Sequence, residues 1–165
     1  MPRPAPLAPP HLIMSIKVAT DAAVDREQWL RPVAFEMPAG MIGFPEATRL
    51  EVILNPEELP FMWLRCVENH ALNFIVIEPH AFIAGYTIEL TDDDAARLEV
   101  ERPEDVFVFN VVNFKADHPE AATVNLIGPV VVNRRTLKGR QLIISNYADY
   151  SARHPLIASG SAGQA

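Results

Sequence analysis

Two runs of β-branched and aliphatic residues lie in the last third of the chain. Residues 123–133 read TVNLIGPVVVN, and residues 140–144 read RQLII. Thr, Val and Ile favour strands, and the charged segment between the runs contains Lys138-Gly139, where glycine tolerates a positive φ in a tight connection. The pattern predicts a β-hairpin. It contains no nucleophile, acid pair or metal cluster, so we expect a protein that acts through its surface.

Strand-like runs also fill most of the chain before this hairpin. They are separated by Asn, Pro and Gly, and the gaps are too short for the helical crossovers that parallel strands need. The run at 106–114 is apolar on both faces, which is typical of a central strand covered on two sides. The predicted fold is all-β and mainly antiparallel, a small closed or flattened β-barrel-like domain. The expected strands cover residues 33–37, 49–54, 61–67, 72–77, 86–90 and 106–114.

One segment predicts a short helix near residues 92–99. The Thr91 hydroxyl can accept a hydrogen bond from the first turn, and Asp94 stands three residues further on, as in a capping box. Asp92 and Asp93 suit the positive end of the helix dipole. We expect Pro103 to end this helix, because a proline inside a helix is costly.

The two ends of the chain differ in composition from its centre. Five prolines precede Met14, which predicts a disordered leader over residues 1–13 and one folded domain over residues 14–156. Residues 157–165 are rich in Gly, Ser and Ala and are expected to form a flexible tail. The sequence leaves open whether translation starts at Met1 or at Met14.

The overall composition narrows the possible functions. The 165 residues are 49% hydrophobic and carry a net charge of -7. An acidic chain is a poor match for nucleic acid, whose phosphates are bound by Lys and Arg. No apolar run is long enough for a signal sequence or a membrane span, and the single Cys66 reads as a buried hydrophobe in a reducing compartment. We expect a cytoplasmic protein without membrane contact.

The chain offers little that would support catalysis. It has neither a phosphate-binding glycine motif nor a nucleophile elbow. Its histidines lack the i, i+2 or i, i+4 spacing of paired metal ligands. We therefore expect no metal, no cofactor and no enzymatic activity. Two alternatives stay open, a nucleic-acid-binding small β-barrel and, less favoured, an enzyme on a barrel scaffold. The histidines are His11, His70, His80, His118 and His154.

Charge is concentrated in two segments. Residues 89–105 contain eight acidic residues and two arginines, a local charge of -6. Such a patch either complements the helix dipole and aids solubility or steers a basic partner. A basic cluster occupies the predicted hairpin tip, where it is interpreted as a solvated turn or, less readily, as a nucleic-acid footprint. This basic cluster consists of Arg134, Arg135, Lys138 and Arg140.

Several short motifs follow one another along the chain. The earlier ones are GMIGFPE at 40–46, PFMWL at 60–64, IVIEP at 75–79 and Tyr86. The closing ones are TVNL at 123–126, Pro129, Asn133, Gly139, Gln141, Tyr150, Arg153 and Leu156. In this order the motifs resemble the flagellar assembly factor FliW family, and together they cover residues 15–156. The chain departs from the family pattern in loops, at Ile42, Gly85 and Gly128, where proline, an acidic residue and alanine are usual.

The resemblance implies a cytoplasmic flagellar assembly factor with two protein partners. One is flagellin, recognised near its carboxyl-terminal helical region before export. The other is the carbon storage regulator CsrA, a small RNA-binding dimer that represses translation of flagellin mRNA. By analogy, the free protein antagonises CsrA until accumulating flagellin displaces it, so that flagellin synthesis follows export. This role needs no catalytic residue, no direct contact with nucleic acid and no membrane.

Charge and apolarity suggest where these partners bind. The acidic residues match the basic surface of an RNA-binding protein. The aromatic residues suit an apolar groove that receives an amphipathic helix, although such residues more often belong to a core. The acidic candidates are Asp92, Asp93, Asp94 and Glu101, and the aromatic candidates are Phe44, Phe61, Trp63 and Tyr86.

Three amide residues of the family motif complete the candidate set: Asn125, Asn133 and Gln141. Each lies beside a proline-containing or turn segment, where the hydrogen-bond ladder of a sheet is interrupted. An amide side chain at such a place can satisfy backbone groups instead of contacting a partner. The structural and the partner-binding interpretation therefore both stand for these residues.

Overall fold

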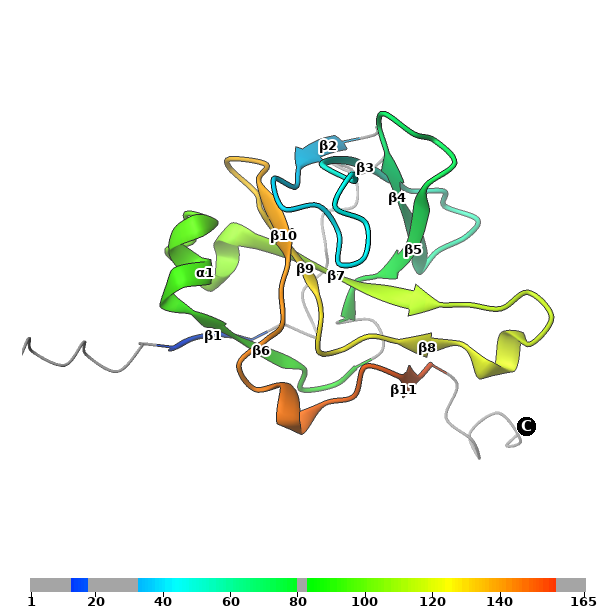
Figure 1. Cartoon of the computed structure of the whole chain (residues 1–165). Helices are drawn as coiled ribbons and strands as arrows, with labels where there is room; N and C mark the ends of the chain where they lie inside the picture. Colours follow the sequence, from blue (N-terminus) through cyan, green and yellow to red (C-terminus); the bar gives the residue numbers. More distant parts are fainter. Residues whose placement is uncertain (1–12, 18–32, 80–82, 157–165) are drawn as a thin grey trace, which may run out of the picture.

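The computed structural model describes residues 13–17, 33–79 and 83–156 (Figure 1). These residues form eleven strands and one short α-helix, α1 (Asp92–Arg97). The expected leader, except Ile13, and the expected tail lie outside the described residues. The strands are β1 (Ile13–Lys17), β2 (Val33–Glu36), β3 (Arg49–Ile53), β4 (Phe61–Cys66), β5 (Asn73–Ile77), β6 (Thr87–Thr91), β7 (Val106–Asn113), β8 (Thr123–Val124), β9 (Val130–Asn133), β10 (Gly139–Gln141) and β11 (His154–Pro155).

The strands make one large and one small antiparallel sheet. The large sheet has the order β10-β9-β7-β5-β4-β3-β2, with β8 paired to β7 and β11 paired to β8, and the small sheet pairs β1 with β6. Sequential neighbours from β2 to β5 pair directly, as the short gaps predict. The expected mainly antiparallel fold with one short helix is confirmed.

The large sheet curls but stays open. Its two outermost strands, β2 and β10, meet through a single parallel bridge between Glu36 and Lys138. The Glu36 amide donates there to the carbonyl of Leu137 at 2.8 Å. One bridge is not a paired strand, so the sheet is an open, strongly curved one rather than a closed barrel.

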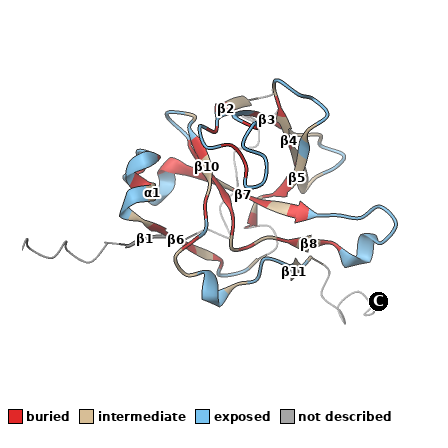
Figure 2. Ribbon diagram, viewed as in Figure 1, coloured by how far each residue is buried: buried red, intermediate tan, exposed pale blue. Residues whose placement is uncertain are grey.

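The curled sheet separates two hydrophobic cores. Along β7, Phe107 and Phe109 face the first core, and Val106 and Val112 face the second. Alternation of this kind follows from the two-residue period of a strand. The prediction that 106–114 is covered on both sides is confirmed for β7 and extends to β9, whose four residues are all buried. Figure 2 shows the exposed residues gathered on α1 and on the loops.

Helix α1 begins as predicted but ends differently. The Thr91 hydroxyl accepts from the Asp94 amide at 3.1 Å, which caps the first turn. At the other end the Glu99 amide donates to Ala96 and the Val100 amide to Ala95, with Glu99 at a φ of 55°. This pair of hydrogen bonds is a Schellman motif, which stops the helix without a proline. The expectation that Pro103 ends the helix is wrong; Pro103 instead opens a 3-10 turn, Pro103–Asp105.

The closing hairpin is confirmed, but its glycine has another role. The positive φ in the connection between β9 and β10 belongs to Leu137, at 55°, whereas Gly139 lies inside β10. A Cβ on Gly139 would stand 3.0 Å from the Met37 sulfur and 3.1 Å from a ring carbon of Phe35. Gly139 therefore allows β2 and β10 to approach closely. Strand β10 ends at Gln141, so the predicted second run of the hairpin is only partly a strand, and Ile143 beyond it is 51% exposed.

Candidate interaction surfaces

Asn133 joins the hairpin to the end of the helix. Its Nδ2 donates to the carbonyls of Leu98 at 2.8 Å and Glu99 at 3.1 Å, and its Oδ1 accepts from the amides of Arg135 and Thr136. The residue is fully buried. All four hydrogen bonds satisfy backbone groups, so the geometry favours the structural interpretation of this motif residue.

Asn125 and Gln141 stabilise neighbouring turns. Asn125 Oδ1 accepts from the amides of Ile127 at 3.1 Å and Gly128 at 3.0 Å. Gln141 Nε2 donates to the Gly128 carbonyl at 3.0 Å, and its Oε1 accepts from the Ile42 amide at 2.9 Å. Gln141 thus connects two loops that are far apart in the sequence. Ile42 is 57% exposed, and Gln141 fixes the backbone that presents it.

Tyr86 lies at the centre of a buried polar network. Its hydroxyl donates to the Leu126 carbonyl and accepts from Asn110 Nδ2 at 3.2 Å. Burial, reinforced by nearby Tyr150, raises the pKa of the Tyr86 phenol well above its usual value, against the opposing hydrogen bond from Asn110. Tyr86 therefore stays neutral and contributes to the second core, and its burial favours the structural alternative over direct partner contact.

The remaining aromatic candidates lie on opposite sides of the large sheet. Phe44 is 39% exposed and packs edge-on against Phe74, which borders the first core. Phe61 borders the second core instead. Trp63, on the same face of β4 as Phe61, donates from its indole nitrogen to Glu58 at 2.8 Å. The four aromatic residues are therefore not brought together in one groove.

A row of partly buried apolar side chains crosses three strands. In the register of β3, β4 and β5, Ile53 stands opposite Trp63 and Trp63 opposite Ile75. Residues directly opposite one another share a face of the sheet. We call these three residues the outer strip. Next to it, Arg65 and Glu51 form an ion pair at 2.6 Å, so a charged pair borders the apolar row.

The acidic segment around α1 is only partly a free surface. Asp93 pairs with Arg97 at 3.0 Å, and Glu99 lies 3.6 Å from Lys138 Nζ. Asp105 is buried and accepts from the amides of Glu101 and Arg102. Although burial alone would raise it, these hydrogen bonds and the charges of Arg102 and Arg135 hold the pKa of Asp105 below its usual value. The acids at this end whose side chains are exposed include Asp92, Asp93, Glu101 and Glu104.

Part of the basic hairpin tip is used within the fold. The Arg134 guanidinium stacks 3.9 Å from the centroid of the Phe107 ring and donates to the Val106 carbonyl. Burial lowers the pKa of Arg134, and the charge of Glu78 opposes this effect. Arg135 donates to the Glu99 carbonyl, where a cation complements the carboxyl end of the helix. Together with Lys138, which pairs with Glu99, three of the four cations therefore have contacts within the fold.

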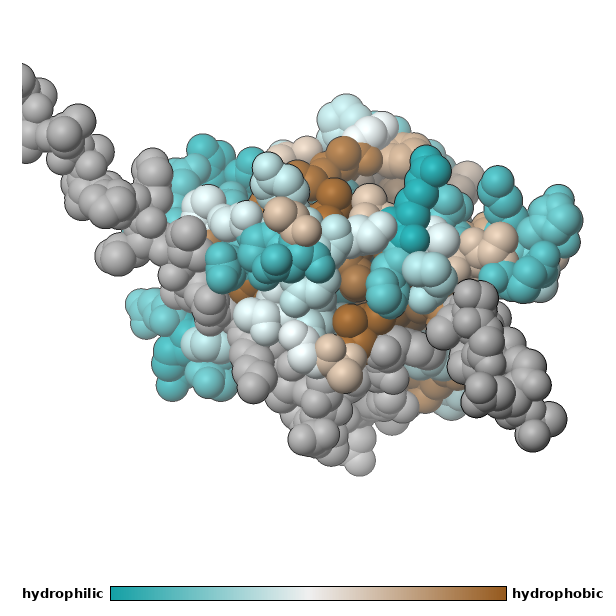
Figure 3. Space-filling view, turned by 90° about the horizontal axis from the view of Figure 1, so that it is seen from below, coloured by the Kyte–Doolittle hydropathy of each residue, from teal (hydrophilic) through white to brown (hydrophobic). Residues whose placement is uncertain are grey.

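Two kinds of feature are absent from the residues that the structure describes. Within residues 13–17, 33–79 and 83–156, no three His, Cys, Asp or Glu side chains are arranged to hold a metal ion. In the same residues no helix is long and apolar enough to cross a membrane. Seen from below, hydrophobic residues surface as separate patches between hydrophilic ones on the part of the face that is not drawn grey (Figure 3). The fold and these surfaces define a small, mainly antiparallel β-sheet protein with separate charged and apolar surfaces.

Comparison with known proteins identifies the group within this class. The chain belongs to the FliW protein family, whose model matches residues 16–156. A flagellar assembly factor FliW from Geotalea uraniireducens is 39% identical over 130 residues, 78% of this chain and 77% of that protein. Its counterpart from Magnetococcus marinus is 36% identical over 125 residues, 76% and 75% of the two chains. A crystal structure of the flagellar assembly factor FliW superposes with a TM-score of 0.70 at 28% identity, covering 87% of this chain and 99% of that one.

The exposure of three apolar residues was not predicted from the sequence. Ile42 lies in a loop of the family motif, Phe114 ends the run predicted to be covered on both sides, and Ile143 lies in the second run of the predicted hairpin. An aliphatic residue in a strand-like run gives no signal that distinguishes surface from core. The predicted partner contacts stay a prediction for all the candidates: Asp92, Asp93, Asp94, Glu101, Phe44, Phe61, Trp63, Tyr86, Asn125, Asn133 and Gln141.

Proposed function

We propose that this protein is a cytoplasmic flagellar assembly factor that binds flagellin, antagonises CsrA and catalyses no reaction. Membership of the FliW family carries the proposal, because relatives that match most of the chain are named flagellar assembly factors. The surfaces of the described residues support a binding role. When this protein is not bound to flagellin, it would bind CsrA and keep it from flagellin mRNA. Flagellin that has not yet been exported would compete with CsrA for this protein.

The exposed acids at the start of α1 are the proposed contact for CsrA. Asp92 and Asp93 are exposed, and the Asp93 side chain keeps 69% of its accessible surface despite its pair with Arg97. Asp94 is half-buried beside them, and Glu101 lies just beyond the helix. An RNA-binding protein presents a basic surface, and complementary charge accelerates its encounter with an acidic patch.

The outer strip is the proposed contact for flagellin. An amphipathic helix buries its apolar stripe against a complementary apolar surface. Ile53, Trp63 and Ile75 are partly exposed and lie in cross-strand register, and Ile75 also packs against the second core. Trp63 is the natural anchor, because large aromatic residues dominate the energetics of protein interfaces.

Titration calorimetry against flagellin from the same cell tests the first arm. We expect saturable binding, and an increase in Kd of about tenfold or more for Trp63→Ala, since a central aromatic anchor carries much of the binding free energy. Phe114→Ala is the matched control, because Phe114 is 45% exposed at the end of β7, outside the outer strip. If the titration shows no saturable binding, flagellin is not a partner. If Trp63→Ala and Phe114→Ala weaken flagellin binding equally, the outer strip is not the contact.

Charge reversal tests the second arm. We expect the triple variant Asp92→Lys, Asp93→Lys, Asp94→Lys to weaken CsrA binding about tenfold or more at low salt and to reduce its salt dependence. A control variant reverses the exposed Asp117, Glu120 and Asp149, which changes the net charge equally at other loops. Circular dichroism of both variants verifies that the fold is kept. The same affinity in the two variants would exclude the patch as the interface.

A further inference from the structure

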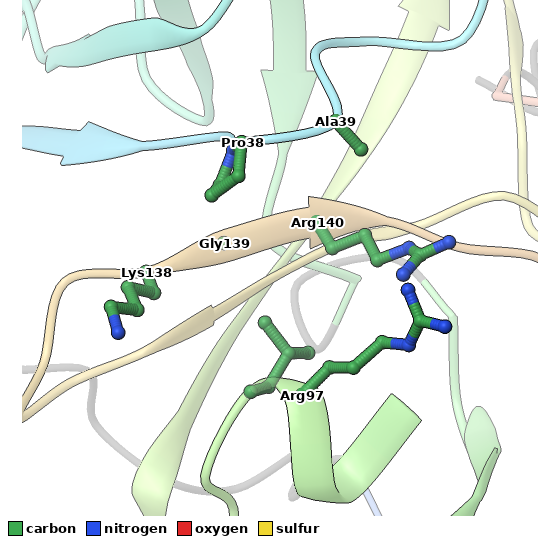
Figure 4. Close-up of a pocket in the computed structure, with 7 residues that line it drawn as sticks. Pro38, Ala39, Arg97, Lys138, Gly139 and Arg140 are labelled. Atoms are coloured by element: carbon green, nitrogen blue, oxygen red, sulfur yellow. The ribbon is translucent and has the colours of Figure 1, made fainter. Parts of the chain in front are cut away.

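A hollow of about 300 Å³ lies between the end of α1 and the closing hairpin. Its lining combines apolar and cationic residues. Pro38, Leu98 and Gly139 contribute apolar or bare backbone surface, and three cations, Arg97, Lys138 and Arg140, stand around it (Figure 4). Neither the sequence patterns nor the family role proposed above uses this hollow.

Two arginines from different elements line the same hollow. Arg97 reaches in from α1 and Arg140 from β10, and both groups point the same way (Figure 4). Lys138 points to the other end, where its Nζ lies 3.6 Å from a Glu99 carboxylate. Like charges placed together repel each other, and an anion between them would turn this repulsion into attraction.

The two arginines have unequal partners within the protein. Arg97 uses its Nε for Asp93, at 3.0 Å, which leaves its terminal nitrogens facing Arg140. In the part of the chain that the structure describes, no carboxylate pairs with the Arg140 guanidinium. Arg140 is nevertheless half-buried, so among the described residues its charge lies at the hollow without a paired carboxylate. A planar guanidinium in such a position is suited to bind a carboxylate or a phosphate in a bidentate manner.

The surroundings favour a carboxylate on a peptide over a polyphosphate. The chain has a net charge of -7, which opposes the approach of nucleic acid. Two of the three cations at the hollow, Arg97 and Lys138, pair with carboxylates of this chain, so carboxylates are anions that these groups accept. The apolar surface of Pro38 and Leu98 can receive an aliphatic side chain next to the charged one.

We propose that this hollow binds an acidic peptide segment of a protein partner, with a Glu or Asp carboxylate held between Arg97 and Arg140 and a neighbouring apolar side chain against Leu98. The site gives the basic hairpin a recognition role apart from the acidic patch and the outer strip. It does not depend on flagellin or CsrA being the partners. Because the Arg97 side chain is 59% exposed, a minimal ligand should bind with a Kd in the millimolar range.

Nuclear magnetic resonance of the arginine Nε–Hε groups in the full chain tests the site directly. The probe is N-acetyl-glutamyl-leucinamide, and the matched control probe is N-acetyl-glutaminyl-leucinamide. We expect saturable shifts of the Arg97 and Arg140 signals with the glutamyl probe only. Arg153, exposed beside β11 and away from α1, serves as an internal control that should not move (Figure 1).

Substitutions and a competing anion complete the test. Arg140→Gln should raise the Kd about tenfold, the loss expected for one bidentate charged contact, and Arg153→Gln should leave it unchanged. The proposal is overturned if the glutaminyl probe shifts both signals equally, if Arg153 responds as strongly as Arg140, or if no shift saturates. Tighter binding of inorganic phosphate than of the glutamyl probe would also overturn it, in favour of a phosphate site.

Discussion

Asn133 Nδ2 donates to the Leu98 carbonyl at 2.8 Å, across 35 residues of sequence. This contact ties the end of β9 to the end of α1, and the Asn133 Oδ1 shapes the following turn at the same time. The helix has only six residues, so its position depends on such contacts more than on its own hydrogen bonds. Asn133 therefore holds the end of α1 and the hairpin of β9 and β10 in a fixed position relative to each other.

Replacing this amide should destabilise the whole fold. We expect Asn133→Ala to lower the free energy of unfolding by about 2–3 kcal/mol, because it leaves buried backbone groups without partners. Asn113→Ala is the control, since Asn113 is exposed at the end of β7. Urea denaturation of both variants provides the measurement. A loss below that of the control would mean that water replaces the Asn133 side chain at no cost.

The loop that presents Ile42 contains two glycines with different constraints. Gly40 has a φ of 69°, and a Cβ there would stand 2.6 Å from the Pro45 carbonyl oxygen, whereas Gly43 has a φ of 86° and open space around it. We expect Gly43→Ala to cost about 1–2 kcal/mol, the strain of a left-handed alanine. Gly40→Ala should cost more, because the clash is with backbone atoms. Urea midpoints compare the two, and equal costs would contradict the clash.

Tyr86 should make stability depend on alkaline pH. Because burial raises its folded-state pKa, the stabilisation is complete below the unfolded value of about 10 and is lost as pH rises beyond it, where the unfolded chain ionises first. Tyr86→Phe should remove this part of the alkaline slope. At neutral pH it should also cost about 1–3 kcal/mol, because the Leu126 carbonyl loses its donor. Tyr147→Phe, at a 56% exposed residue, is the control in urea titrations across pH, and identical slopes in the two variants would contradict the expectation.

Asp105 should make the stability of the fold depend on pH in the acidic range. Its folded-state pKa is depressed, so its stabilisation is present above the unfolded value of about 3.9 and is lost as pH falls through the folded one. Asp105→Asn should therefore unfold at lower urea concentration than the parent at neutral pH, with the two midpoints converging in acid. Glu104→Gln is the control, because it neutralises a neighbouring carboxylate that is exposed. Midpoints that differ by the same amount at every pH would show that charge plays no part.

Local sequence patterns predicted the elements with good accuracy. The strand from 106 to 114 was recognisable because it is apolar at successive positions, and β7 is buried on both faces as expected. The start of α1 was recognisable from Thr91, whose hydroxyl acts locally on Asp94. The end of the helix was not recognisable. The left-handed residue that ends a helix is usually glycine, but here it is Glu99.

What the sequence determined by itself was therefore the antiparallel class, the short helix, the charged segments and, through its motifs, the FliW family. Those properties depend on residues close together in the chain or on their order along it. The burial of Asn133 and Tyr86, the close contact of Gly139 with β2, and the presence of Arg97 and Arg140 at one hollow follow only from the three-dimensional fold. Each of these depends on how the sheet curls, and that curvature arises from packing on both its faces at once.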